Sequence, residues 1–396
     1  MDQYYTYVYI KKQYILEKKI MKVMYIAPRF HTNQSAVVKG WIERGDEVTF
    51  ISYYTAIIED YSYVKPIVLG FSKWYYPIDW LYVNVIKRHD PGNTAFKINH
   101  GFPPILRIRK VMRTEKPDLV IMRDRTLYTI VANLFCKIYG YSAILYNQSP
   151  LWDRPPKQDF LHKLVRKMTP EKRMTPVIGD KSEEKQIEKG SFFVPFVVEA
   201  QMEPKEKVYF YNNKIEILSI GKFEPRKHHI MLAGIIGELS EKIPDIHLTI
   251  IGEATGRLQK EHLQEVETYI KDNHLEDYVD IKINVPRKET DDYFKRTDVF
   301  VIPSTREMAS ISQLEAMSFS IPVIISDKNG AACYVKDGQS GYLFKDCDRE
   351  DLKKKLMEML SDRERIKKMG EESYHQVCEK YTFQNYYRAV MEMMRN

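Results

Sequence analysis

Cysteine is scarce in this sequence, and its few cysteines are not spaced as metal or redox sites are. The four lie far apart in a chain of 396 residues: Cys136, Cys333, Cys347 and Cys378. Metal-binding cysteines usually come in close pairs, and small secreted domains rely on dense disulfides. We therefore expect a reducing compartment, the cytoplasm, and we expect no metal site.

Long hydrophobic runs are also missing. No segment approaches the roughly 20 apolar residues that a membrane-spanning helix needs. Residues 1–20 lack the apolar centre and the cleavage site of a signal peptide. We interpret them as an extension ahead of a domain whose first strand begins at Met21. With 44% hydrophobic and 29% charged residues and no low-complexity tract, the composition is that of a soluble globular chain with about two domains.

The net charge of +7 is unevenly distributed. Residues 1–200 hold 31 lysines and arginines against 20 acidic residues, whereas the remainder holds 30 against 34. A basic first half indicates an anionic partner there, although an ordinary solvated surface would give the same count. Nucleic-acid binding is a poor alternative, because no zinc finger, helix-turn-helix or RNA-recognition motif accompanies the charge.

Short apolar runs alternate with helix-length amphipathic segments almost from end to end. This pattern predicts parallel strands covered on both faces, in doubly wound α/β units. The series occurs twice, with a polar break at 194–214. We predict one Rossmann-like domain over 21–200 and a second over 201–379, facing each other across a cleft. The helical segment at about 380–396 is expected to pack back onto the first domain.

Ligands of such sheets lie beyond the carboxyl ends of the strands, so the residues that follow each strand carry most information. No G-x-G-x-x-G fingerprint follows a strand in the second half, which disfavours a nicotinamide-dependent enzyme.

A basic loop, GKFEPRKHH, follows the predicted strand EILSIG. Gly221 allows a tight turn, and Lys222, Arg226 and Lys227 come within six residues of it. Cations ahead of a helix suit a phosphate or diphosphate, since lysine binds phosphate as a point charge. The alternative is a basic loop on the solvated surface.

Two glutamates, Glu307 and Glu315, lie eight positions apart between two apolar runs in PSTREMASISQLEAMSFSIPVI. Each has an ordinary explanation. Glu307 can be an exposed loop charge, and Ser312 with Glu315 matches a capping box that would only stabilise a helix.

Together, these motifs resemble glycosyltransferase family 4, whose members have the GT-B fold of two Rossmann-like domains. The resemblance covers about residues 215–360. It includes the E-x7-E element as Glu307–x7–Glu315, the basic element from Gly221 to Lys227, and the stretch SDKNGAACYVKDGQSGYLF. The first half resembles the family only in overall pattern.

The resemblance implies retaining transfer of a sugar from a nucleotide-diphosphate sugar, with no cofactor and no essential metal. By position, Lys222 and Lys227 would hold the diphosphate, Glu307 the donor-sugar hydroxyls and Glu315 the ribose. Gly221, Ser310 and Ile311 would lie beside the phosphates. Lysine stands at 222 where the family usually has arginine, and Met308 with Ala309 replaces the usual glycine- or proline-aromatic pair, so the sugar is not identified.

In this architecture the first domain binds the acceptor: a glycan, a lipid-linked molecule or a protein. His31 follows the first strand, and Asp124 follows the run DLVIM. Asp124 is a candidate for orienting the acceptor hydroxyl or the donor sugar, and His31 is a candidate catalytic residue. A structural role for His31, and an ion pair of Asp124 with Arg123 or Arg125, are the alternatives.

Aromatic and basic residues mix at 71–89, in ILRIRKVMR and in LHKLVRKM. Such segments suit peripheral contact with anionic lipid at the inner face of the plasma membrane, or they belong to the core or an acceptor cleft. Within the same fold, a nucleotide-sugar epimerase is the main rival, and it would need no separate acceptor.

Overall fold

The computed structural model describes residues 20–55, 61–86, 97–98, 100–151, 159–179 and 189–395. The predicted extension at 1–20 therefore lies, apart from Ile20, outside the described residues.

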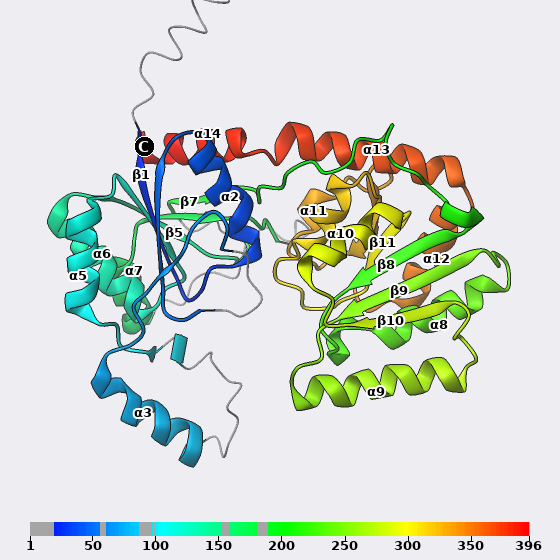
Figure 1. Cartoon of the computed structure of the whole chain (residues 1–396), viewed down its shortest axis with the longest axis horizontal. Coiled ribbons are helices and arrows are strands. Elements are labelled where there is room, and N and C mark those ends of the chain that lie inside the picture. Colours follow the sequence, from blue (N-terminus) through cyan, green and yellow to red (C-terminus); the bar gives the residue numbers. More distant parts are fainter. Residues whose placement is uncertain are drawn as a thin grey trace, which may run out of the picture. The chain divides into compact units, whose positions relative to one another are not determined.

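The first sheet has seven strands in the order β3-β2-β1-β4-β5-β6-β7 (Figure 1). Its strands are β1 (Lys22–Ala27), β2 (Glu47–Ser52), β3 (Ile67–Val68), β4 (Leu119–Arg123), β5 (Ser142–Tyr146), β6 (Lys172–Thr175) and β7 (Ser191–Phe193). Strand β1 pairs in parallel with both β2 and β4. The chain order thus reverses beside β1, which makes the gap between β1 and β4 the switch point of this sheet.

The second sheet has six strands in the order β10-β9-β8-β11-β12-β13. Its strands are β8 (Ile215–Ile220), β9 (Ile246–Gly252), β10 (Val279–Ile283), β11 (Val299–Ile302), β12 (Val323–Ser326) and β13 (Gly341–Phe344). All five neighbouring pairs are parallel. The switch point of this sheet lies between β8 and β11.

Helices connect these strands, as the alternating pattern predicts (Figure 1). They are α2 (Thr32–Glu43), α3 (Tyr76–Leu81), α5 (Ile105–Glu115), α6 (Leu127–Tyr139), α7 (Phe160–Met168), α8 (His229–Ser240), α9 (Arg257–Asp272), α10 (Arg287–Arg296), α11 (Ser312–Ser318), α12 (Arg349–Leu360), α13 (Arg363–Lys380) and α14 (Phe383–Arg395).

Both faces of the second sheet are buried, which explains why its strands are almost continuously apolar. Successive residues of a strand point to opposite faces. Val299 and Val301 pack in one cluster with α8, α9 and α12, whereas Phe300 and Ile302 pack in another with α10, α11 and α13. A sheet covered on both sides is the doubly wound arrangement, and the fold class predicted from the sequence is confirmed for both sheets.

The polar segment ahead of β8 is packed against the second sheet. The Lys207 side chain is buried, and its Nζ donates to the carbonyl oxygens of Phe294 at 2.8 Å and Lys295 at 3.1 Å. Burial lowers the pKa of Lys207 to about 7. The Asp298 carboxylate accepts hydrogen bonds from the backbone N–H groups of Phe210 and Glu216. Lys207 and Asp298 therefore connect this segment to the second sheet by hydrogen bonds with backbone groups.

By compactness the chain divides into residues 1–145 with 164–171, and residues 146–163 with 172–396. This division places β6 and β7 in the second unit, whereas their hydrogen bonds place them in the first sheet. Because these two divisions differ, the domain boundary near residue 200 stays a prediction, and so does the return of 380–396 to the first domain. Within the described ranges, no helix is both long and apolar enough to cross a bilayer.

Candidate functional site

The predicted site residues of the second half gather at the switch point of its sheet. The basic loop at 221–228 follows β8, and the loop at 303–311 follows β11, the strand next to β8. Parallel neighbouring strands end at the same edge, so the two loops meet there. The backbone N–H of Thr305 donates to the carbonyl oxygen of Arg226 at 3.0 Å, which joins them directly.

Lys227 and Glu307 form the centre of this site. The Lys227 ammonium donates to Oε2 of Glu307, and the side chains are 11% and 15% exposed. Arg226 reaches the same oxygen at 3.1 Å and also pairs with Glu224 at 2.8 Å. Within the described part of the chain, Oε1 of Glu307 accepts no hydrogen bond. One oxygen of this carboxylate is thus held by cations, and the other can accept a ligand hydroxyl.

The side chain of Lys227 packs closely over Gly221. A Cβ at position 221 would lie 3.2 Å from Cδ of Lys227, so the aliphatic part of the lysine crosses directly over Gly221. Lys222 is different, because it is about half exposed and pairs with Glu253 at 3.4 Å. The structure therefore joins Lys227 to Glu307, while the phosphate role of Lys222 stays a prediction.

Glu315 does not form the capping box that its spacing allows. Helix α11 begins after Ile311 with no side-chain cap, so the capping alternative is wrong. The largely buried carboxylate instead pairs through Oε1 with Arg287 at 3.0 Å. Burial raises the pKa of Glu315, Arg287 lowers it, and Asp291 raises it. Arg287 was missed at the sequence level, since it follows β10 and nothing in its local motif connects it to Glu315.

The loop that carries Glu307 is held against a second loop that follows β12. The backbone N–H of Gly330 donates to the carbonyl oxygen of Glu307 at 2.9 Å. A Cβ at position 330 would lie 1.9 Å from the carbonyl oxygen of Met308. Between these contacts, Ser310 is buried, with its hydroxyl 3.2 Å from that of Ser312. The Met308 side chain is 55% exposed.

We predict that Gly330→Ala destabilises the protein by about 1–3 kcal/mol and also weakens binding of any ligand that contacts Glu307. An alanine methyl cannot share space with the Met308 carbonyl, so one loop must shift. Urea unfolding and ligand titration would measure both effects. Gly256→Ala is the matched control, because its Cβ would meet nothing closer than 3.9 Å. Equal stability of the two variants would contradict the prediction.

Asp124 and His31 both follow strands at the switch point of the first sheet. Asp124 comes directly after β4 with a φ of 60°, which is unusual for a non-glycine residue. It pairs with Arg123 at 3.6 Å, as the ion-pair alternative predicts, and burial raises its pKa. His31 precedes α2, where its backbone N–H donates to Oε1 of Gln34 at 3.1 Å. Their roles toward an acceptor stay predictions.

The aromatic residues of 71–86 divide between core and surface. Phe71 and Tyr75 are buried, whereas Trp74, Tyr76 and Trp80 are 51–63% exposed. Phe71 and Tyr75 thus fit the core alternative, whereas lipid contact by the exposed aromatic residues stays a prediction. Residues 87–89 lie outside the described part of the chain.

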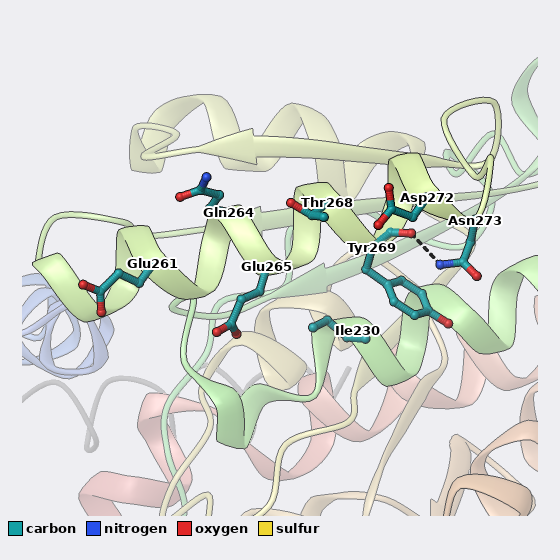
Figure 2. A pocket seen from close by; sticks show the side chains of 8 residues that line it. All are labelled: Ile230, Glu261, Gln264, Glu265, Thr268, Tyr269, Asp272 and Asn273. Carbon is teal, nitrogen blue, oxygen red and sulfur yellow. Dashed lines mark hydrogen bonds between the residues drawn. The ribbon is translucent and has the colours of Figure 1, made fainter.

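One pocket of 590 Å³ lies between the first turn of α8 and the outer side of α9 (Figure 2). Ile230 and Tyr269 lie at its base, and Glu261, Glu265 and Asp272 project around it. None of the residues that line it belongs to the loops with Lys227 and Glu307, so it is separate from the candidate site. Across the described ranges, no group of three or more histidine, cysteine or acidic residues is placed to hold a metal ion.

The chain matches a protein family over its second half. Residues 201–376 match the family model described as "Glycosyl transferases group 1". This range contains the loops with Lys227, Glu307 and Glu315. The match covers less than half of the chain, and it begins after β7, the last strand of the first sheet.

Individual relatives are identical to the chain at about a quarter of the aligned positions. A GDP-mannose-dependent alpha-(1-6)-phosphatidylinositol monomannoside mannosyltransferase of Mycolicibacterium smegmatis is 23% identical over 193 residues, 47% of this chain and 49% of that protein. A D-inositol 3-phosphate glycosyltransferase of Paenarthrobacter aurescens is 28% identical, over 41% of this chain and 43% of that protein. The chain thus spans about half the length of these relatives, or less.

Solved structures extend the fold comparison to nearly the whole chain. A glycosyltransferase from Rickettsia africae has a TM-score of 0.71 at 14% identity, covering 95% of this chain and 98% of its own. HepE of Anabaena, solved in complex with UDP, has a TM-score of 0.69 at 10% identity, covering 95% and 100%. Identities this low establish the fold alone, and that fold is GT-B, as predicted.

Proposed function

We propose that this protein is a glycosyltransferase of family 4 that moves a hexose from a nucleotide-diphosphate sugar to an acceptor with retention of configuration. One observation carries the proposal. The Lys227–Glu307 pair and the Glu315 carboxylate are brought to one edge of a parallel sheet, at its switch point. Cations beside half-satisfied carboxylates suit a ligand that has both phosphates and vicinal hydroxyls.

The donor would bind with its diphosphate against Lys227, and against Lys222 once that lysine leaves Glu253. Glu307 would accept hydroxyls of the sugar through Oε1, and Glu315 would accept the ribose hydroxyls. Ser310 and the backbone N–H of Ile311 would lie beside the phosphates. As the sugar departs, negative charge grows on the diphosphate, and the Lys227 ammonium would stabilise it most at that point.

We further propose that the first sheet binds the acceptor, with Asp124 and His31 as orienting groups. Acceptors of three classes fit a polysaccharide or glycoconjugate pathway: a glycan, a lipid-linked molecule or a protein. The names of two relatives include phosphatidylinositol monomannoside and inositol 3-phosphate, which supports a polar polyhydroxylated acceptor. We place the enzyme in the cytoplasm, at the inner face of the plasma membrane, and assign it no cofactor and no essential metal.

Thermal-shift titration with UDP, GDP, ADP and their sugar conjugates tests the donor half of the proposal. A ligand that binds only the folded state raises the melting temperature by mass action. One nucleotide diphosphate should stabilise the protein, and chelation of divalent metals should leave the shift intact. Stabilisation by none of them would refute the donor site.

Product analysis separates transfer from epimerisation. The protein would be incubated with UDP-glucose, UDP-galactose, UDP-N-acetylglucosamine and GDP-mannose, and products separated by chromatography. Release of the nucleotide diphosphate with transfer or slow hydrolysis supports a transferase. Conversion of one nucleotide sugar into another, with no nucleotide released, would identify an epimerase instead. A salt-sensitive shift of DNA or RNA without nucleotide-sugar binding would favour a nucleic-acid-binding protein.

A further inference from the structure

Helix α7 presents its apolar side chains to solvent. Phe160 is 76% exposed, Leu161 is 69% exposed, and no residue of the helix is buried. Leu164 and Met168 are each 41% exposed. A surface helix of a globular protein normally turns its apolar stripe to the core. Exposed apolar clusters of this kind mark interaction surfaces.

The apolar and basic residues of α7 are completely separated around its axis. At about 100° per residue, its five apolar residues fall within an arc of about 140°, and its four basic residues occupy the rest. The apolar stripe is Phe160, Leu161, Leu164, Val165 and Met168, and the basic residues are His162, Lys163, Arg166 and Lys167. The helix contains no acidic residue, although Asp159 just before it pairs with His162.

Two hydrogen bonds from side chains of α6 to backbone carbonyls of α7 join these helices. Nδ2 of Asn133 donates to the carbonyl oxygen of Met168 at 2.9 Å, and Nζ of Lys137 donates to that of Lys167 at 3.3 Å. Next to these two donors on α6, Leu134 is 55% exposed and Ile138 is 60% exposed. The exposed apolar surface thus continues from α7 onto the helix that supports it.

Exposure of an apolar stripe is not general among the amphipathic helices of this chain. Helix α14 has an equally clear pattern, yet it buries Tyr386, Val390 and Met393. Helix α5 buries Ile108 and Met112. Helix α3 also buries none of its residues, but its sequence YPIDWL contains no basic residue. Helix α7 therefore calls for a partner with both apolar and anionic character.

We propose that the apolar stripe of α7 inserts into the headgroup region of a membrane that contains anionic lipids. A bilayer surface accepts apolar side chains at the acyl boundary and pairs flanking cations with phosphate headgroups, which matches the two arcs of α7. Long lysine and arginine side chains can reach the headgroups while the helix lies flat. The net charge of residues 1–200, with 31 basic and 20 acidic residues, favours the same surface.

A second copy of the chain is a poorer partner for this face. A symmetric contact would pack the apolar stripes of both copies together, but α7 has no acidic residue to offer Lys163 and Lys167 of the other copy. Nucleic acid would satisfy these cations but would leave Phe160 and Leu161 in water. Of these three partners, the lipid surface is the one that can bury the apolar stripe and also pair with the basic residues of α7.

Vesicle co-sedimentation with the full chain tests this proposal. The wild type should bind vesicles of phosphatidylcholine with phosphatidylglycerol more tightly than vesicles of phosphatidylcholine alone. Phe160→Ser with Leu161→Ser should weaken binding to both by at least about tenfold. Lys163→Gln with Lys167→Gln should weaken binding to the anionic vesicles by about fivefold per cation, with little effect on neutral ones.

Matched controls are available on α9. Leu258 is 73% exposed and Lys260 is also exposed, so Leu258→Ser and Lys260→Gln make the same chemical changes elsewhere. All variants should melt within a degree or two of the wild type, since surface changes cost little. Thermal shifts with nucleotide diphosphates should be unchanged in the α7 variants, so failure here is distinguishable from failure of the donor site.

Two results would overturn the proposal. Unchanged vesicle binding in the α7 variants would move any membrane contact to another surface, such as the exposed aromatic residues of 74–80. A change of oligomeric state in Phe160→Ser with Leu161→Ser, measured by light scattering without a change in vesicle binding, would show that another copy covers the stripe.

Discussion

Glu307→Gln is expected to lower the kcat/KM of sugar transfer by about 100- to 1,000-fold while the protein stays folded. Glutamine keeps the shape of the side chain but removes its charge. Lys227 and Arg226 both donate to Oε2 of Glu307, so this change leaves two cations without their shared counter-ion. It also weakens the acceptor at Oε1, which we assign to the donor sugar. Nucleotide release, followed by chromatography, measures the rate.

The matched control for this variant is Glu372→Gln. Glu372 pairs with the ammonium of Lys336 in the same compact unit, much as Glu307 pairs with Lys227, but its partner lies outside the site loops. It should lose no activity. Near-normal turnover of Glu307→Gln, at an unchanged melting temperature, would remove Glu307 from the site.

The strands were predictable because a sheet covered on both faces demands continuous apolar runs. VFVI of β11 is buried at every position, as expected of a short parallel strand that is covered on both faces. The place of Glu307 was predictable for a related reason, because the loop that follows such a strand lies at the edge of the sheet. Glu315 comes from the first turn of α11, the helix that this loop leads into.

Contacts between loops far apart in the chain were not predictable. Gly330 lies more than 20 residues from Glu307 in the sequence. The need for glycine there follows only from the structure, in which a Cβ at position 330 would lie 1.9 Å from the carbonyl oxygen of Met308. The Glu315 capping box failed for a similar reason. Its local pattern was correct, but Arg287, from another loop, pairs with the carboxylate. Likewise, nothing in the polar break at 194–214 indicated that the ammonium of Lys207 donates to the backbone carbonyls of Phe294 and Lys295.

Glu315→Gln is expected to raise the Kd for a nucleoside diphosphate by about 10- to 100-fold, the cost of losing hydrogen bonds to an ionised group. The test includes a ligand change. With a 2′,3′-dideoxynucleoside diphosphate, wild type and variant should bind almost equally, because the hydroxyls that Glu315 would contact are gone. Calorimetric titration of both proteins with both ligands gives the four Kd values that this comparison needs. An equal loss for the dideoxy ligand would mean that Glu315 supports the fold and does not bind the ribose.

Arg287→Gln should shift the pH dependence of the same affinity. Burial raises the pKa of Glu315, and Arg287 is the group that lowers it, while Asp291 raises it. Asp291 also loses its 2.8 Å partner when Arg287 is removed. Both changes push the pKa of Glu315 upward. Only the ionised carboxylate accepts both ribose hydroxyls, so the affinity for the nucleoside diphosphate should fall as the pH is lowered through the pKa of Glu315. In Arg287→Gln this fall should begin at a higher pH than in the wild type. In Glu315→Gln the loss of affinity at low pH should be absent, since no carboxylate remains to titrate. The same loss at the same pH in wild type and both variants would mean that another group causes it.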